Sequence, residues 1–510
     1  MQPELPPQYE TGVKNLWVAL LCILAIWVGS TWLFWIGYVG VDDIFYARYA
    51  HFLHRPPMVW WEFRIPFILA QRACFSIFGT TELAAAMPTL AASLALVACT
   101  GWMIGWPRKL TWETNLTMVL AAVLPLDLAF RSWPSATYFA GALCGVGTAF
   151  WLRGNGRLMY IGSAIFAFAF AAHESMVFYI AIFCGFCLLS DWKRFLKPML
   201  LLGVLVAINF TAEAGAYQKL LGHPFARYQM SSSGAAKSVA GYDADTGISG
   251  LRFYTWPIEI LFASKHFAGS LLLLFVGGAM AWRKLSRDQK LLFLTVAGTW
   301  VWIGWGTLVP WTYQPFFRQF HYFSPILLGL NTLMPAVVFL VLRPLAARCL
   351  LIGMVGIYFL AAGSGGRWGE AFESSRALLV YADKHPTTTF LTDVSTMNHM
   401  YAIRGFTLPT NVICLNGPAV AKHLLLNKEP VGTPVFAFGN AVPQAILFNT
   451  EGPSLFAYEE EFTRFVEEHP GEHETVLPVQ RKWLFAHIPG ISNRPLAIRN
   501  LGAEVIHLKP

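Results

Sequence analysis

The most prominent pattern along the chain is a series of long apolar runs separated by short polar segments. A helix needs about 20 apolar residues to cross a bilayer core of about 30 Å. On this criterion the sequence predicts about eleven transmembrane helices. Their approximate positions are 16–39, 83–105, 114–130, 135–152, 158–172, 176–190, 198–212, 267–282, 291–309, 323–342 and 349–363. We therefore expect an α-helical polytopic membrane protein.

One apolar stretch, residues 158–190, is too long for a single span. Its 33 residues would extend over about 50 Å as one helix. The polar pair His173 and Glu174 lies near its middle, so we expect a turn there that holds both side chains near the external face. The alternative is that this pair only hydrogen-bonds the two helix ends.

Two connecting segments are too apolar to be ordinary loops. Residues 42–80 combine many aromatic residues with several arginines, a pattern typical of amphipathic helices in the membrane interface. The second segment, residues 213–265, has the same mixed character and also contains a polar part near 231–250. We expect them to form external loops, at 40–82 and 213–265, of a membrane domain that covers residues 1–363.

The pattern changes after about residue 363. No further membrane-length run follows, and helix and strand patterns alternate, which predicts a small α/β domain over 364–510. The predicted helices cover 373–385, 396–404 and 462–469, and the predicted strands cover 387–391, 411–415 and 435–437. No glycine-rich phosphate-binding motif is present, so we assign no nucleotide to this domain.

Composition and charge indicate the class and the orientation. With 55% hydrophobic and 13% charged residues, the chain has too little polar surface for a soluble protein of its size. The net charge of +8 comes largely from cations in alternate short loops, which predicts a cytoplasmic N-terminus and an external C-terminal domain. We therefore expect membrane lipids, and no nucleic acid, as partners. The first 15 residues lack the features of a removable signal, so the first run is expected to remain as a helix.

An ionisable cluster follows the first apolar run. It begins with Asp42 and Asp43 and continues to His54 and Arg55. Charged groups at the edge of a helix bundle are costly to place in a membrane and therefore indicate a functional site. The alternative is that Asp42 or Asp43 only caps a helix that begins at Ile44.

Four motifs in this order resemble the GT-C glycosyltransferases, in particular the family of protein O-mannosyltransferases and lipid A aminoarabinose transferases. They are Asp42-Asp43-Ile44-Phe45-Tyr46, Arg55-Pro56-Pro57-Met58-Val59-Trp60-Trp61, Phe78-Gly79-Thr80 and Arg318-Gln319-Phe320-His321-Tyr322-Phe323-Ser324-Pro325. The similarity covers about the first 340 residues. The resemblance implies a GT-C fold, in the bacterial inner membrane, with a periplasmic C-terminal domain.

The resemblance also implies a reaction. A sugar would move, with inversion, from a polyprenyl-monophosphate carrier to a lipid, glycan or protein acceptor at the external face. Asp42 would be the general base, and Arg55 would contact the donor phosphate. The chain departs from the family pattern at His54, where some relatives have an acidic residue, and at Ser135, where an aspartate is often found.

The chemistry requires the same residue types without reference to any family. A hydroxyl is a poor nucleophile, so a carboxylate must accept its proton, and cations must stabilise the departing phosphate. The further candidates are Asp43, Tyr46, His54, His173 and Glu174 as supporting residues, Arg131 and Arg318 as phosphate ligands, and Trp60 and Tyr322 as sugar or lipid contacts. A monophosphate leaving group needs less charge compensation than a diphosphate, so a metal is optional, and we predict that no metal or other cofactor is required.

Three other functions remain open at the level of the sequence. The chain could be a GT-C polymerase or ligase that uses a diphosphate-linked lipid. It could be a lipid or solute transporter, with Asp42, His173 and Glu174 as a proton relay, although the acidic groups gather at one face and not at the midplane. It could also be a non-catalytic assembly subunit whose external domain recruits a partner.

Overall fold

The computed structural model describes most of the chain, and its contacts divide the protein into two compact units. The described residues are 13–38, 41–53, 57, 60–107, 110–229, 242–243, 248–307, 315–316, 318–364, 370–407, 409–414, 443–449, 459–478 and 502–508. The first unit comprises Met1–Phe34, Arg64–Phe67 and Thr89–Ala362. The second unit comprises Trp35–Phe63, Ile68–Pro88 and Gly363–Pro510.

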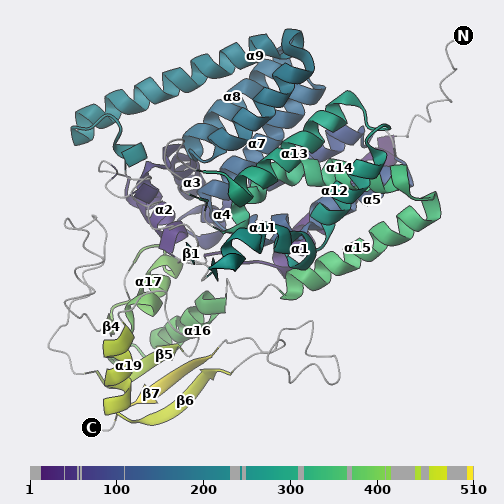
Figure 1. The fold of residues 1–510 in the computed structure, drawn as a ribbon. Helices are drawn as coiled ribbons and strands as arrows, with labels where there is room; N and C mark the ends of the chain where they lie inside the picture. Colours follow the sequence, from purple (N-terminus) through teal and green to yellow (C-terminus); the bar gives the residue numbers. More distant parts are fainter. Residues whose placement is uncertain are drawn as a thin grey trace, which may run out of the picture. The chain divides into compact units, whose positions relative to one another are not determined.

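The first unit is a bundle of helices (Figure 1). Its elements are α1 (Val13–Leu33), most of α4 (Glu82–Ile104), α5 (Trp112–Val123), α6 (Pro125–Phe130), α7 (Ala136–Arg153), α8 (Gly156–Ala172), α9 (Met176–Leu221), α11 (Leu251–Ala263), α12 (Ser270–Ala281), α13 (Arg287–Trp305), η2 (Phe320–Ile326), α14 (Leu327–Val341) and α15 (Pro344–Ser364). Within it α7 packs on α8 and η2, and α12 packs on α14.

Each of the eleven predicted spans overlaps a helix of this bundle. Six helical stretches in the described part of the chain are long and apolar enough to cross a membrane: Asn15–Leu33, Glu82–Ile104, Trp112–Phe130, Met176–Leu221, Phe320–Val341 and Pro344–Gly363. The predicted spans at 158–172 and 267–282 are shorter apolar helices. The predicted fold class, a polytopic helical membrane protein with a small C-terminal domain that contains a sheet, is confirmed.

The helices differ in how much of their apolar surface is covered. In the most apolar part of α9 only 17% of the residues are buried, against 78% in the stretch that includes α14. Exposed apolar side chains on a polytopic protein are the surface that lipid covers. We therefore place α9 at the lipid-facing perimeter and α14 in the bundle core.

Local sequence explains where several helices begin and end. α8 ends at Ala172 and α9 begins at Met176, so the predicted turn at His173 and Glu174 is confirmed. The spans predicted at 176–190 and 198–212 form one helix with a non-helical residue, Asp191, between them. This helix continues to Leu221, beyond the predicted end of the span, and stops where Gly222 adopts a positive φ of 72°.

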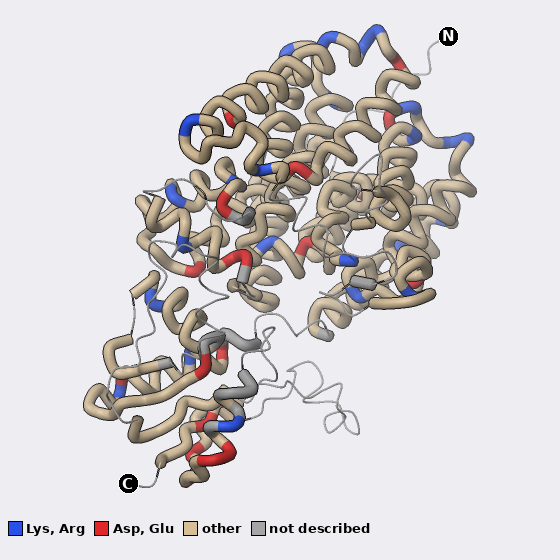
Figure 2. Tube along the Cα trace, turned by 60° about the vertical axis from the view of Figure 1, so that its left-hand side comes forward, with Lys and Arg blue, Asp and Glu red and all other residues tan. Residues whose placement is uncertain are grey.

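Charged residues are sparse within the bundle and more frequent at the helix ends. Figure 2 shows long uncharged stretches in the first unit and Lys and Arg gathered along its upper edge. Such a distribution is expected when the helices lie in lipid and their connections lie in water.

The second unit combines the first long connection with the C-terminal residues. It contains α2 (Val41–Phe52), η1 (Trp60–Phe63), most of α3 (Ile65–Phe78) and the first turns of α4. α2 and α3 are the helices that the sequence predicts within residues 42–80. The sequence pattern predicts that this connection belongs to the membrane domain, whereas the contacts group it with the C-terminal residues.

The C-terminal part of the second unit is a five-stranded sheet with helices on both faces. Its strand order is β4 (Val412–Cys414), β3 (Phe390–Thr392), β5 (Ala445–Asn449), β7 (Ala503–His507) and β6 (Glu472–Leu477). β4, β3 and β5 are parallel, and β7 and β6 are antiparallel to their neighbours. The predicted α/β pattern is thus a mixed sheet.

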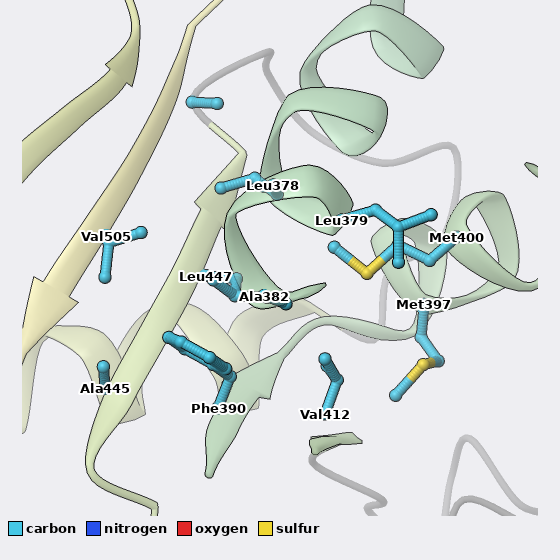
Figure 3. Close-up of a cluster of buried hydrophobic side chains, with 11 residues drawn as sticks. Leu378, Leu379, Ala382, Phe390, Met397, Met400, Val412, Ala445, Leu447 and Val505 are labelled. Atoms are coloured by element: carbon cyan, nitrogen blue, oxygen red, sulfur yellow. The ribbon is translucent and has the colours of Figure 1, made fainter. Parts of the chain in front are cut away.

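Buried side chains attach the helices to this sheet. Figure 3 shows α16 (Glu370–Lys384) and α17 (Val394–Ile403) against one face, where Leu378, Met400 and Phe390 meet. On the other face, Phe462 of α19 (Glu459–Glu468) packs against Ile446. The three predicted helices and the first two predicted strands are observed. The strand predicted at 435–437 lies outside the described residues, and β5, β6 and β7 were not predicted.

Candidate active site

The candidate residues are distributed over both units. Asp42, Asp43 and Tyr46 belong to the second unit, and Arg131, His173, Glu174, Arg318 and Tyr322 belong to the first. His54 and Arg55 lie outside the described residues. Trp60 is the first residue of η1, and its side chain is likewise not described.

The two aspartates occupy the first turn of α2. The helix begins at Val41, so both carboxylates lie within its first turn and not before it. A negative charge there is stabilised by the free N–H groups and the helix dipole. Asp43 is 1% exposed, and its Oδ1 accepts a hydrogen bond from the backbone N–H of Ile44 at 3.0 Å. Asp42 is half-buried, and Tyr46, one turn later, is buried.

The chain just before α2 is held by Glu82. The backbone N–H of Tyr38 donates to Oε1 of Glu82 at 3.0 Å, and Arg376 of α16 forms an ion pair with Oε2 of the same carboxylate. The phenol of Tyr38 is buried. Burial raises the pKa of Tyr38 well above its usual value, and the negative charges of Glu82 and Asp43 raise it further. Tyr38 is therefore a neutral neighbour of the aspartates.

The far end of α2 is closed by Arg72 of α3. Its Nη1 donates to the backbone carbonyls of His51 and Ala50 at 2.5 and 3.3 Å. A cation there offsets the negative end of the helix dipole. His51 itself is within 2.9 Å of the Thr80 hydroxyl. Burial, with the nearby charge of Arg72, lowers the pKa of His51, so its ring is neutral at pH 7.

In the first unit, the turn between α8 and α9 carries a network of four charged residues. Glu174 forms ion pairs with Arg64 and, at 3.1 Å, with Arg227. Arg227 also pairs with Glu213 near the end of α9 at 2.7 Å. Both guanidinium groups are almost fully buried, while each carboxylate side chain is 20% exposed. Two cations and two anions balance, which makes this burial tolerable.

Electrostatics fix the charge states at this turn. Burial raises the pKa of Glu174, but the charges of Arg64 and Arg227 outweigh it and hold that pKa well below its usual range. Burial and the charge of Arg64 lower the pKa of His173, so the ring is neutral at pH 7. Its Nδ1 lies 2.8 Å from the Ser175 hydroxyl. The ring also meets the ring of Tyr322 edge-on, with centroids 6.3 Å apart.

Arg131 is the centre of a second buried network. Its guanidinium donates to Asp127 at 3.2 Å, to the Ser30 hydroxyl at 2.7 Å and to the carbonyl of Ala122 at 2.8 Å. Tyr138 and Ser93 donate to the same Asp127 carboxylate. Because Arg131 is 0% exposed, these contacts give it a structural role between α1, α5 and α6 and leave its guanidinium turned away from solvent, unlike the phosphate ligand that the sequence predicts.

Arg318 has a similar position. It is 1% exposed and donates to the backbone carbonyls of Phe253, Ile303 and Phe316 at 3.1 to 3.2 Å. Its guanidinium carbon also lies 4.0 Å from the centre of the Phe253 ring, a cation–π contact. These contacts bind the chain before η2 to α11 and α13, and they likewise favour a structural role.

The sequence pattern did not distinguish four residues of these networks, Arg64, Arg227, Glu82 and Arg376. Arg64 and Arg227 had no motif that distinguishes them from other interfacial arginines, and Glu82 and Arg376 are 294 positions apart. The signal that could have identified Arg64 is its position directly after an aromatic run and before a proline-containing helix start. Among the described residues, no group of three His, Cys, Asp or Glu side chains is placed to hold a metal ion.

Comparison with solved structures identifies the fold. ArnT from Cupriavidus metallidurans in the apo state matches with a TM-score of 0.55 and 11% identity, over 97% of this chain and 98% of that chain. The same protein bound to undecaprenyl phosphate matches with a TM-score of 0.54, the same identity and the same coverage. The chain therefore has the GT-C fold of ArnT, as the four motifs predict.

A weaker match involves the Archaeoglobus fulgidus oligosaccharyltransferase in complex with Zn and sulfate. It has a TM-score of 0.47 and 12% identity over 86% of this chain and 68% of that chain. No protein-family model and no curated protein matches the sequence.

Proposed function

We propose that this protein is an integral-membrane, inverting glycosyltransferase. It moves a sugar from a polyprenyl-monophosphate carrier to a hydroxyl of a lipid, glycan or protein at the external face of the membrane. The observation that carries this proposal is the match over 97% of the chain to ArnT, one of whose structures is bound to undecaprenyl phosphate. The acidic first turn of α2, at the start of the first long connection, supports it from the sequence side.

The proposed reaction is a single displacement. The acceptor oxygen forms a bond to the anomeric carbon of the sugar from the side opposite the phosphate. The bond from that carbon to the phosphate oxygen breaks, and the phosphate leaves with the bonding electrons. Asp42 takes the proton of the acceptor hydroxyl, which would otherwise be too poor a nucleophile. The product is inverted at the anomeric carbon.

The remaining roles follow from charge and burial. We assign the donor phosphate to Arg55, because a guanidinium can bind phosphate oxygens in bidentate fashion. Asp43 and Tyr46 support the first turn of α2, His54 lies beside the phosphate ligand in the sequence, and Trp60 and Tyr322 are proposed sugar or lipid contacts. His173 and Glu174 shape the turn between α8 and α9, whose network offers carboxylate oxygens to solvent.

The orientation is part of the proposal. The cations predicted to be cytoplasmic lie in connections such as 283–290, and Lys and Arg gather along one edge of the first unit in Figure 2. By the positive-inside rule these connections face the cytoplasm, and the alternation of the predicted spans along the chain then leaves the first long connection and the residues after 363 outside. In a bacterium the protein would lie in the inner membrane.

The test is sugar transfer by purified Asp42→Asn protein. Asparagine preserves the size of the side chain and its hydrogen bonding but cannot accept a proton, so turnover should fall by about 10² to 10⁴-fold. The substrate is a polyprenyl-monophosphate sugar, and the readout is the labelled acceptor product. Near-normal turnover would refute Asp42 as the base.

The matched control is Asp43→Asn. Asp43 accepts a backbone hydrogen bond in the same turn, and asparagine can accept it equally well, so only a mild loss is expected. If the enzyme instead requires a diphosphate-linked sugar, the monophosphate donor will give no product with any variant, and the polymerase or ligase alternative gains support.

A further inference from the structure

We infer that the C-terminal domain positions the helix that carries Asp42, with Arg376 of α16 as the principal positioning residue. The inference rests on the proposed function, because it takes Asp42 as the base. It gives the C-terminal domain a role in turnover that is separate from donor binding. The residues involved all belong to the second unit.

The first contact lies before the start of α2. Arg376 pairs with one oxygen of Glu82, and the other oxygen of Glu82 accepts the backbone N–H of Tyr38, four residues before Asp42. Gly37 allows this approach, because it has a φ of +69° and a Cβ at this position would overlap the Glu82 carboxylate. A helix of the C-terminal domain therefore fixes the carboxylate that anchors the chain leading into α2.

The second contact lies at the end of α2. The turn after α17 places Gly405 against the Thr80 carbonyl, where a Cβ would lie 2.7 Å from that oxygen. The ring of Phe406 lies 5.7 Å from His51 and 6.4 Å from Phe52, centroid to centroid. The C-terminal domain thus contacts the end of α2 directly, and it connects through Glu82 to Tyr38, three residues before this 12-residue helix begins.

The connection through Glu82 and the contacts of Phe406 restrict how α2 can move or rotate. A general base must lie within hydrogen-bond reach of the proton that it removes, and a misplacement of about 1 Å can reduce the rate by about 10²-fold. The Arg376 side chain is 44% exposed, and ion pairs so exposed contribute little to global stability. Its removal should therefore reduce turnover without lowering thermal stability appreciably.

The experiment measures kcat, KM for a polyprenyl-monophosphate sugar and Tm for full-length Arg376→Ala, Arg376→Lys and Glu82→Ala. For Arg376→Ala we expect kcat to fall by about 10-fold to 100-fold while donor KM and Tm stay close to the wild-type values. Arg376→Lys should recover most of kcat, because it retains the charge. The double variant Arg376→Ala with Glu82→Ala should be no slower than Glu82→Ala alone, because both changes break the same connection.

Lys384→Ala is the control, since Lys384 is an exposed cation on the same helix and belongs to neither contact. Its kcat should remain at the wild-type level. An unchanged kcat in Arg376→Ala, or a raised donor KM with an unchanged kcat, would overturn the inference. In that case an inactive Asp42→Asn protein would still support the proposed function. An active Asp42→Asn protein would overturn both.

Discussion

Four arginines of the first unit are almost completely removed from solvent, and they are held in three different ways. Arg64 and Arg227 share the carboxylate of Glu174. Arg131 combines one carboxylate with backbone carbonyls and a hydroxyl, whereas Arg318 donates to three carbonyls and lies over an aromatic ring. A buried guanidinium is stable only when such acceptors replace water. These four arginines therefore stabilise the helix bundle, and their guanidinium groups are already occupied by acceptors of the protein.

The first residue-scale prediction concerns the pair of Arg131 and Asp127. Arg131→Met should lower the free energy of unfolding by about 3 to 5 kcal/mol, because it leaves the Asp127 carboxylate buried without its cation. Denaturation in detergent, followed by tryptophan fluorescence, measures the change. If stability is unaffected and donor KM rises instead, Arg131 is the phosphate ligand that the sequence suggests.

The second residue-scale prediction concerns pH and His399 of α17. Its ring is buried, with Nδ1 3.1 Å from the Ser375 hydroxyl, and burial lowers the pKa of His399 to about 4. In the unfolded chain the ring takes up a proton near pH 6.5. Between pH 6.5 and about 4 the unfolded state therefore binds more protons than the folded state, and the free energy of unfolding decreases as the pH falls. The loss from this residue is on the order of 3 kcal/mol.

Thermal melts of full-length wild-type and His399→Gln protein between pH 7.5 and 4.5 test this linkage. Glutamine cannot be protonated but can still bond to Ser375, so its Tm should decline less on acidification. Parallel pH profiles of the two proteins would show that His399 is not buried in its neutral form.

At the scale of elements, the sequence predicts the helices better than it predicts the strands of the C-terminal sheet. Apolar length and the polar pair at His173 were enough to predict α8, the start of α9 and the turn between them, because water, lipid and helix length act locally on these residues. The continuation of α9 as one helix to Leu221 was not predicted. The strands β5, β6 and β7 were not predicted. The short strand β5 reads as one apolar run, and the first four residues of β6 are polar and exposed. A strand of this kind is defined by its neighbours and not by its own pattern.

In the candidate site, too, features that depend on local sequence could be predicted, and features that depend on distant residues could not. The acidic turn at Asp42 and Asp43 could be predicted, since consecutive charges after an apolar run are unusual in any sequence. The partners of Glu174 could not, since Arg64 is 110 and Arg227 is 53 positions away, and only the packing of the bundle brings them to one carboxylate.

A prediction at this scale follows from the Glu174 network, which joins the start of α3, the turn before α9 and the segment after α9. Glu174→Gln should lower the free energy of unfolding by about 3 to 5 kcal/mol, because it preserves shape but leaves two buried guanidinium groups with one carboxylate. Glu259→Gln is the control. The pair of Glu259 with Arg252 is exposed, so its loss should cost about 1 kcal/mol or less. Equal effects of the two changes would contradict the structural role of the network.

At the scale of the whole molecule, the first long connection and the C-terminal residues form one unit, although residues 89–362, 274 residues in all, separate them in the sequence. The ion pair of Glu82 and Arg376 is one such long-range contact. Local pattern carries no information about it, so the sequence could predict both segments but not their association. Their association also requires that both lie on the same side of the membrane.

The last prediction tests that sidedness. Thr387 lies in an exposed turn between α16 and β3, and Arg283 lies in an exposed basic connection between α12 and α13. If the C-terminal domain is external, Thr387→Cys protein should react with a membrane-impermeant maleimide that is added to intact cells. Arg283→Cys protein should react only after lysis, because the positive-inside rule places this connection in the cytoplasm. The unmodified chain measures the background from its own thiols, of which Cys22 and Cys349 are exposed on apolar helices. The reverse labelling pattern would invert the topology and would put the proposed base on the cytoplasmic side, where the proposed transfer could not take place.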